Sequence, residues 1–234
     1  MHTESFDLTI KNLSKIEGHT DLDVVVRDGK VVDAKLRINE NKRFFTTAAV
    51  GKPALAVHQV VSRICGTCSI AHLMCCINSV ENALGVIPSR QTIDLRDLLL
   101  YGLNIRDHAM HLYLFCLPDI FRKDSILDFA DEGLEHDLVH KAFDVKSAGN
   151  DLSVLAGGRA VHSPYPQVGG FMKIPTKESA RKVSDTLVGV RKAAIEFAYI
   201  FRERDSSYEN KTTNIALRND RYSFLGGDLM ASNG

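Results

Sequence analysis

Two cysteines three positions apart are the residues of this chain with the clearest capacity for chemistry. Cys65 and Cys68 are separated by Gly66 and Thr67, and a turn eased by the glycine can aim both sulfurs at one ion. Thiolates select soft or borderline metals, which argues against magnesium or calcium for this pair. We expect Cys68 to open a helix, whose N-terminal dipole favours a thiolate. His72, one helical turn later, could then bind the metal or donate a hydrogen bond to a metal-bound sulfur.

A CxxC pair taken alone fits several kinds of site. It could be half of a zinc site, a redox dithiol or two buried thiols, although the chain has no second CxxC and no thioredoxin-like context for this one. A local four-cysteine site would need Cys75 and Cys76 to face one ion, yet a helix turns adjacent residues about 100° apart. We therefore expect these two cysteines, and Cys116, to be small core residues.

The composition is that of a soluble globular protein without a strong charge bias. The 234 residues include 29 acidic and 29 basic side chains, so the formal net charge is zero, and neither nucleic acid nor an anionic membrane is expected as a partner. No apolar run approaches the roughly 20 residues of a membrane span, and no signal peptide is evident. We expect a cytoplasmic protein, in which an odd number of cysteines favours metal or redox chemistry over disulfides.

The elements that must position these cysteines predict an α+β fold. Residues 6–10, 22–26 and 31–38 are expected to be strands, with a hairpin turn at Asp28-Gly29. From about residue 52 the apolar spacing becomes helical, with helices expected over about residues 53–64, 69–84, 92–116, 131–148 and 176–205. Residues 149–175 are rich in glycine and proline and are expected to form an ordered loop. The predicted domains are a small N-terminal antiparallel sheet, residues 1–42, and a mainly helical body, residues 43–234, that bears the CxxC motif.

The motif around the cysteines resembles that of one enzyme family. Residues 63–72 read RICGTCSIAH and reproduce every fixed position of Arg-x-Cys-Gly-x-Cys-x-x-x-His, the N-terminal metal-binding motif of [NiFe] hydrogenase large subunits. Four further segments are similar to that family: KIEGH at 15–19, RFF at 43–45, LPD at 117–119 and GGRAVHSP at 157–164. The resemblance covers most of residues 6–234 and indicates the N-terminal portion of such a subunit.

The resemblance implies a role for each matching residue. Cys65 would be a terminal nickel ligand, Cys68 would bridge nickel and iron, and His72 would donate a hydrogen bond to the bridging sulfur. Glu17 would relay protons to and from the nickel-bound cysteines, as a carboxyl group among apolar neighbours can near neutral pH. The implied reaction is reversible oxidation of H₂ at a Ni-Fe centre whose iron carries CO and CN ligands.

Two departures from the family pattern affect these expectations. The C-terminal Asp-Pro-Cys-x-x-Cys-x-x-His motif, which supplies two more thiolates, is missing from this sequence. We therefore expect this chain to be a split subunit or a fragment, completed by a C-terminal large-subunit polypeptide that carries the second CxxC motif. Many relatives also bind a structural magnesium (Mg) through a Glu after the Phe pair. This chain has Thr46 there, with Glu40 nearby, which puts that site in doubt.

The electrons released at such a centre need further subunits. Five cysteines are too few for the metal site and for iron–sulfur (Fe-S) clusters, so the clusters are expected in a small partner subunit, followed by further electron-acceptor subunits. Two other functions stay open. One is a non-catalytic scaffold like the quinone-reductase subunits that share this fold but have lost the cysteines, and the other is a small zinc or redox CxxC module.

Overall fold

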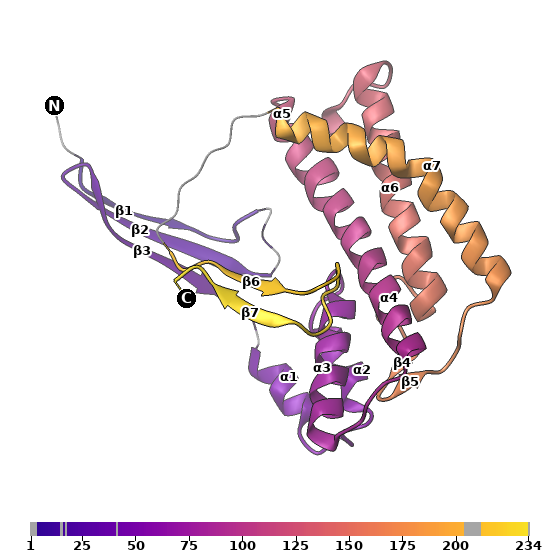
Figure 1. The fold of residues 1–234 in the computed structure, drawn as a ribbon. Coiled ribbons are helices and arrows are strands. Elements are labelled where there is room, and N and C mark those ends of the chain that lie inside the picture. Colours follow the sequence, from indigo (N-terminus) through magenta and orange to yellow (C-terminus); the bar gives the residue numbers. More distant parts are fainter. Residues whose placement is uncertain (1–3, 15, 17, 41, 204–211, 234) are drawn as a thin grey trace. The chain divides into compact units, whose positions relative to one another are not determined.

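The computed structural model describes residues 4–14, 16, 18–40, 42–203 and 212–233 (Figure 1). The chain divides into two compact units, residues 1–50 and residues 51–234. Helix α1 (Lys42–Ala49) belongs to the first unit, whereas the sequence placed a domain boundary between residues 42 and 43. The predicted fold class is confirmed, because a small antiparallel sheet precedes a mainly helical body.

The first unit is a three-stranded antiparallel sheet followed by α1. Its strands are β1 (Phe6–Ile10), β2 (Thr20–Arg27) and β3 (Lys30–Ile38), paired in the order β1-β2-β3. Asp28 and Gly29 connect β2 and β3 with positive φ angles of 53° and 72°. A two-residue hairpin turn of this kind matches the twist of its strands, which explains why Asp-Gly is favoured there.

The register of this sheet separates apolar from charged side chains. Three cross-strand rows lie on one face: Phe6–Val26–Val31, Leu8–Val24–Ala34 and Ile10–Leu22–Leu36. The opposite face carries the ion pairs Arg27–Asp7 and Arg37–Asp23, each at 2.6 Å. Because successive strand residues point to opposite faces, a slip of one residue would exchange the two faces, so this pattern fixes the register.

The second unit is built mainly from helices. They are α2 (Val57–Val61), η1 (Ser62–Ile64), α3 (Ser69–Leu84), α4 (Arg90–His108), η2 (Ala109–Cys116, a π-helix), α5 (Leu117–Ile120), η3 (Ile126–Asp128), α6 (Leu134–Gly157) and α7 (Lys177–Arg202). Two short hairpins complete the unit: β4 (Pro166–Gln167) with β5 (Gly170–Phe171), and β6 (Ile215–Arg218) with β7 (Asp228–Ala231). Helix α6 packs between α4 and α7 (Figure 1).

Several helix boundaries differ from those predicted. Helix α3 has the predicted bounds and ends at Gly85, whose φ of 68° suits a helix C-cap. Helix α6 instead continues to Gly157, nine residues beyond the predicted end, because Gly149 serves close helix packing and not a turn. A Cβ at Gly149 would lie 2.6 Å from the Arg106 backbone nitrogen on α4. Pro118 does not end the preceding helical run but lies in the first turn of α5, where proline is tolerated.

The helical unit contains two apolar clusters. The first joins α3 to α4 through side chains with almost no exposed surface, among them Ile70, Leu73, Ile77 and Leu99. The second joins η2, α6 and α7. In it the Tyr113 and Phe197 rings stack with their centroids 3.8 Å apart. The first cluster includes Ile70, which follows the CxxC motif by two residues.

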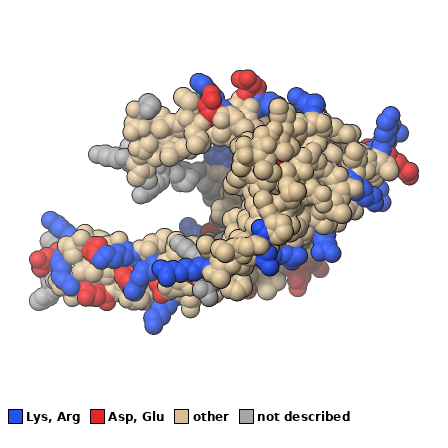
Figure 2. Space-filling model, turned by 90° about the horizontal axis from the view of Figure 1, so that it is seen from below, with Lys and Arg blue, Asp and Glu red and all other residues tan. Residues whose placement is uncertain are grey.

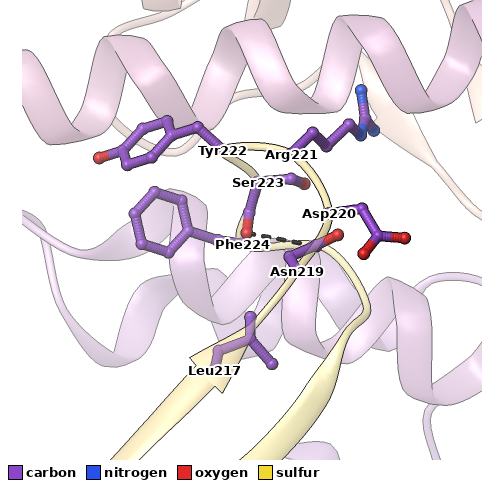
Figure 3. Close-up of a pocket in the computed structure, with 7 residues that line it drawn as sticks. All are labelled: Leu217, Asn219, Asp220, Arg221, Tyr222, Ser223 and Phe224. Atoms are coloured by element: carbon purple, nitrogen blue, oxygen red, sulfur yellow. Dashed lines mark hydrogen bonds between the residues drawn. The ribbon is translucent and has the colours of Figure 1, made fainter.

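The loop between β6 and β7 is fixed to α4 by a buried carboxylate. Ser223 Oγ donates to Asp97 Oδ1 at 2.6 Å, and Arg221 pairs with Asp97 Oδ2 at 2.5 Å. The loop lines an open pocket of about 500 Å³, and Figure 3 shows the Tyr222 and Phe224 rings on one side of the loop with Arg221 on the other. Polar contacts to α4 therefore hold a hairpin that contributes few buried apolar residues.

The charged side chains do not gather by sign on the face shown in Figure 2, where basic and acidic residues are interspersed. Within the described residues, no helix is both long and apolar enough to cross a membrane.

Candidate metal centre

The CxxC motif forms a tight turn between η1 and α3. Cys65 directly follows η1 in an extended conformation, with φ −143° and ψ 141°, and Cys68 is the N-cap residue of α3. The backbone N–H of Cys68 donates to Cys65 Sγ at 3.4 Å, and Thr67 Oγ1 lies 3.8 Å from the same sulfur. Both cysteines are half-buried. Two thiols therefore stand at the two ends of one turn, with a backbone donor aimed at one sulfur.

The start of α3 relates His72 to the cysteines. The Cys68 carbonyl oxygen accepts hydrogen bonds from the backbone N–H groups of Ala71 at 3.0 Å and His72 at 3.2 Å. The prediction that Cys68 opens a helix is thus confirmed. His72 is half-buried and lies one turn after Cys68 on α3, and its role toward a metal-bound sulfur stays a prediction.

The other cysteines do not match the core positions expected for them. Cys75 is exposed and Cys76 is half-buried, because α3 turns Leu73 and Ile77 toward the core instead; Cys116, at the end of η2, is also half-buried. Burial, together with the neighbouring Cys75 thiol, raises the pKa of Cys76. In the part of the chain that the structure describes, no three His, Cys, Asp or Glu residues lie close enough to hold a metal together. A local four-cysteine site is therefore not formed there.

A second loop, residues 158–165, supports the turn from outside α3. It follows α6, which ends at Gly157 and is capped by Gly158 with a φ of 83°. The backbone N–H of His162 donates to Ser69 Oγ at 3.0 Å, and its ring Nδ1 lies 3.0 Å from the Ser62 carbonyl oxygen. Since a carbonyl oxygen only accepts, Nδ1 carries a proton in this contact. Ser62 and Ser69 have no exposed surface, so this loop contacts one buried serine before the CxxC turn and one after it.

Arg106 of α4 connects the turn to that loop. It is only 3% exposed, and its guanidinium donates from Nη2 to the Thr67 carbonyl oxygen and from Nη1 to the Ala160 carbonyl oxygen. Sequence reasoning missed this residue. The signal was its spacing, because Leu99, Leu103 and Arg106 fall on one face of α4 at helical intervals. An arginine in a buried apolar stripe requires polar partners, and so marks a structural or functional contact.

A buried ion pair holds α3 against α4. Arg96 donates from Nη2 to Glu81 Oε1 at 2.6 Å and from Nη1 to Oε2 at 2.8 Å, and the two side chains are 2% and 4% exposed. The Gly169 N–H adds a third hydrogen bond to Glu81 at 2.7 Å. Burial opposes ionisation of Glu81, but the hydrogen bonds and charge of Arg96 and the Gly169 amide outweigh it and lower the pKa of this carboxyl. The pair thereby joins α3 to α4 near the C-terminal end of α3, at the opposite end of that helix from the cysteines.

The remaining predicted residues belong to the first unit. Glu17 lies outside the described residues, so its role in proton transfer stays a prediction. Glu40 lies against Gly18, where an added Cβ would come within 2.5 Å of Glu40 Oε1. Thr46 is exposed on α1. The doubt about a magnesium site that Thr46 raises likewise stays an expectation.

Known proteins share both the sequence and the fold of this chain. Residues 43–150 match the family described as nickel-dependent hydrogenase. The chain is 31% identical to the sulfhydrogenase 2 subunit alpha of Pyrococcus furiosus over 97% of its own length and 54% of that protein. It is 27% identical to the periplasmic [NiFeSe] hydrogenase large subunit of Desulfomicrobium baculatum, over 81% of its length and 41% of that protein. The chain thus spans about half the length of the curated relatives it matches.

Among solved structures, the fold matches that of an NAD⁺-reducing [NiFe]-hydrogenase in the H₂-reduced state. The TM-score is 0.83 and the identity 22%, over 97% of this chain and 54% of that one. The [NiFeSe]-hydrogenase of Dm. baculatum matches with a TM-score of 0.68 and 25% identity, over 83% of this chain and 44% of that one.

The small N-terminal sheet and the helical body that follows it match the fold of a [NiFe] hydrogenase. Together with the sequence matches, they show what the chain is similar to: the nickel-dependent hydrogenase family over residues 43–150, and about half the length of relatives named as hydrogenase subunits.

The residues present fit two of the ligands of a nickel–iron centre. Two half-buried sulfurs at one turn are soft donors of the kind that nickel and iron accept, and the N–H bond to Cys65 Sγ is the outer contact that commonly orients a metal-bound thiolate. The described residues place no third side chain of a ligating type with them. Any further ligands would therefore come from beyond the described residues.

Proposed function

We propose that this chain is the N-terminal portion of a [NiFe] hydrogenase large subunit and that Cys65 and Cys68 supply two of the four thiolates of its Ni-Fe centre. The observation that carries the proposal is the CxxC turn. In it the Cys68 N–H points at Cys65 Sγ, and buried residues hold both flanks of the turn. The relatives of which this chain covers about half are named as hydrogenase subunits, which supports the same assignment.

The chain's own residues would do three things in this reaction. When bound, the nickel–iron centre, with CO and CN on its iron, supplies the reversible cleavage of H₂ into two protons and two electrons. Cys65 and Cys68 would hold that centre through their two thiolates. His72 would donate a hydrogen bond to the Cys68 sulfur, since it follows Cys68 by one turn of α3.

Glu17 would carry the proton released at a cysteine sulfur toward solvent. A carboxyl can accept a proton from a thiol and pass it on when its own affinity for protons is close to that of the donor. Glu17→Gln keeps the hydrogen-bonding shape but removes the exchangeable proton. H₂ oxidation and H/D exchange with solvent should then fall by orders of magnitude at unchanged metal content, and normal turnover in this variant would assign the proton to another route.

Completion of the site needs other polypeptide. The curated relatives are almost twice as long as this chain, which leaves room in them for a second cysteine motif. We propose a C-terminal large-subunit polypeptide that faces Cys65 and Cys68 with two more thiolates, and an Fe-S small subunit that passes electrons to further acceptor subunits. We also propose a cytoplasmic location for the complex.

The test is metal analysis of the natively purified complex with two matched variants. Nickel and iron together, with infrared bands from iron-bound CO and CN, are expected in the wild type. Cys65→Ser or Cys68→Ser should abolish H₂ turnover, because a hydroxyl does not replace a soft thiolate. Cys75→Ala is the control, since this thiol is exposed on the same helix, and it should leave turnover unchanged.

The same measurement distinguishes the other functions. One zinc per chain without the infrared bands would indicate a small zinc or redox module, and a complex without any metal at the CxxC turn would indicate a scaffold. Equal loss of metal in Cys75→Ala and Cys65→Ser would contradict the assignment of ligands.

A further inference from the structure

Arg106 touches the peptide group on which the geometry of the cysteine turn depends. The carbonyl oxygen that it contacts belongs to Thr67, and the N–H of the same peptide group belongs to Cys68. That N–H donates to Cys65 Sγ at 3.4 Å. Because a trans peptide is planar, its C=O and N–H point in opposite directions, and a donor that holds the oxygen also sets the direction of the N–H.

The charge of Arg106 acts on the same peptide. Its guanidinium keeps its charge when buried and is 3% exposed, so its field is only weakly screened. Hydrogen bonds that share a peptide polarise one another, and a charged donor at the oxygen strengthens what the N–H gives to the sulfur.

We propose that Arg106 is a positioning residue for Cys65: by orienting and polarising the peptide group between Thr67 and Cys68, it aims the Cys68 N–H at Cys65 Sγ and so sets the direction and electron density of that sulfur. This inference rests on the proposed function, because it gives the sulfur a metal to bind. In this proposal Arg106 acts on the Cys65 sulfur through the peptide group between Thr67 and Cys68.

The other hydrogen bond of Arg106 ties its guanidinium to the loop that follows α6. Nη1 donates to the Ala160 carbonyl oxygen, two residues before His162, which in turn bonds Ser69 and Ser62 on either side of the turn. On α6, an added Cβ at Gly149 would lie 2.6 Å from the Arg106 nitrogen, so α6 packs directly against the backbone that carries this arginine. Both Nη1 and Nη2 are therefore bound, so the position of the guanidinium does not depend on the cysteine turn alone.

The first test uses amide hydrogen exchange in the metal-free chain, where no hydrogenase activity is needed. Arg106→Met removes both donors but keeps an unbranched side chain. We expect the Cys68 amide to lose about tenfold of its protection, the change that the loss of one hydrogen bond supports. The Ala71 and His72 amides, which bond within α3, should keep theirs. Arg106→Lys keeps the charge but has a single donor nitrogen, so its Cys68 amide should have a protection between that of the wild type and that of Arg106→Met.

Arg96→Met is the matched control. Arg96 lies on the same helix and is equally buried, but its donors go to Glu81 and to the Gln167 carbonyl, away from the cysteines. It should lower the stability of the chain without a selective effect on the Cys68 amide. If Arg106→Met unfolds the chain, the Lys variant decides, because wild-type protection of Cys68 in that variant overturns the proposal.

The second test uses the assembled complex and separates this inference from the proposed function. In variants that retain nickel and iron, Arg106→Met should shift the infrared bands of CO and CN, because the electron density on the Cys65 sulfur changes, whereas Arg96→Met should leave them in place. Unshifted bands at full metal content would overturn the role of Arg106 alone. Absence of such bands from the wild type would instead overturn the proposed function, and exchange at Cys68 would still report the contact.

Discussion

The buried pair between Glu81 and Arg96 gives the sharpest prediction about stability. Arg96→Met replaces the guanidinium by an apolar side chain and leaves the Glu81 carboxylate in a position that is 4% exposed, with the Gly169 N–H as its remaining donor. Removing one partner of a buried ion pair costs about 3–5 kcal/mol, since the other charge stays desolvated. We therefore expect the free energy of unfolding at pH 7 to fall by about that amount.

Removing both charges should cost less. In the double variant Glu81→Leu with Arg96→Met, no buried charge is left, and the cost comes from the polar groups that lose their partners: the Gly169 N–H, the Gln167 carbonyl and the Asn78 side chain. Unpaired backbone groups cost about 1–3 kcal/mol each when water cannot reach them. We expect the double variant to be more stable than Arg96→Met, which would show that the penalty comes from the isolated carboxylate and not from lost packing.

The pH dependence supplies the sign test. In the wild type the pKa of Glu81 lies below its ordinary value, so the pair's contribution is present above the pKa of the unfolded chain and is lost as pH falls through the lower folded pKa. In Arg96→Met, burial, the largest influence on Glu81, outweighs the remaining Gly169 hydrogen bond and raises the pKa of this carboxyl. Its penalty is then absent at low pH and grows as pH rises through about 4.3, the unfolded value. The difference between wild type and Arg96→Met should thus shrink from pH 7 to pH 5.

The assay is urea-induced unfolding of the purified chain, followed by far-UV circular dichroism at both pH values. Arg90→Ala is the control, because the Arg90–Asp94 pair lies on the same helix but is exposed to solvent, and its loss should leave the midpoint unchanged. The reasoning is refuted if Arg96→Met and Arg90→Ala unfold at the same urea concentration, or if the double variant is the least stable of the set.

Three further substitutions test the packing that positions the site. Phe197→Ala empties a fully buried position of α7 and should cost about 3–5 kcal/mol in urea unfolding; a loss below 1 kcal/mol would contradict its place in the core. Gly149→Ala puts a Cβ 2.6 Å from the Arg106 nitrogen and should cost about 1–3 kcal/mol through separation of α4 and α6, so a neutral or raised thermal midpoint would count against that approach. Ser223→Ala removes a hydrogen bond to the buried Asp97 carboxylate, worth about 1.5–3 kcal/mol. It should speed proteolysis of the β6–β7 loop, and unchanged cleavage would show that the loop is held otherwise.

The sequence determined much of the local structure of this protein. Alternation at residues 6–10 and 31–38 and the Asp28-Gly29 turn were enough for the N-terminal sheet, because the turn and the pleat both depend on neighbouring residues. The bounds of α3 followed from its apolar spacing and from Gly85 at its end. The CxxC spacing likewise determined that two sulfurs could meet at one turn.

The tertiary structure decided what glycine and charge mean at a given position. Gly149 predicted a loop but lies inside α6, because the contact that requires a glycine comes from α4, more than forty residues away in sequence. Cys75 was expected in the core but faces solvent, since packing of Leu73 and Ile77 sets the rotation of α3.

The arrangement of residues around the candidate metal centre was likewise decided by the tertiary structure. Three distant segments form it: Arg106 lies on α4, His162 in the loop after α6, and the cysteines in the turn before α3. Local sequence patterns do not predict which carbonyl oxygen a buried guanidinium will contact. Residue types and spacing therefore determined which atoms could bind a metal. The direction in which those atoms are held was decided only by packing, because hydrogen bonds between distant segments form once the helices have met.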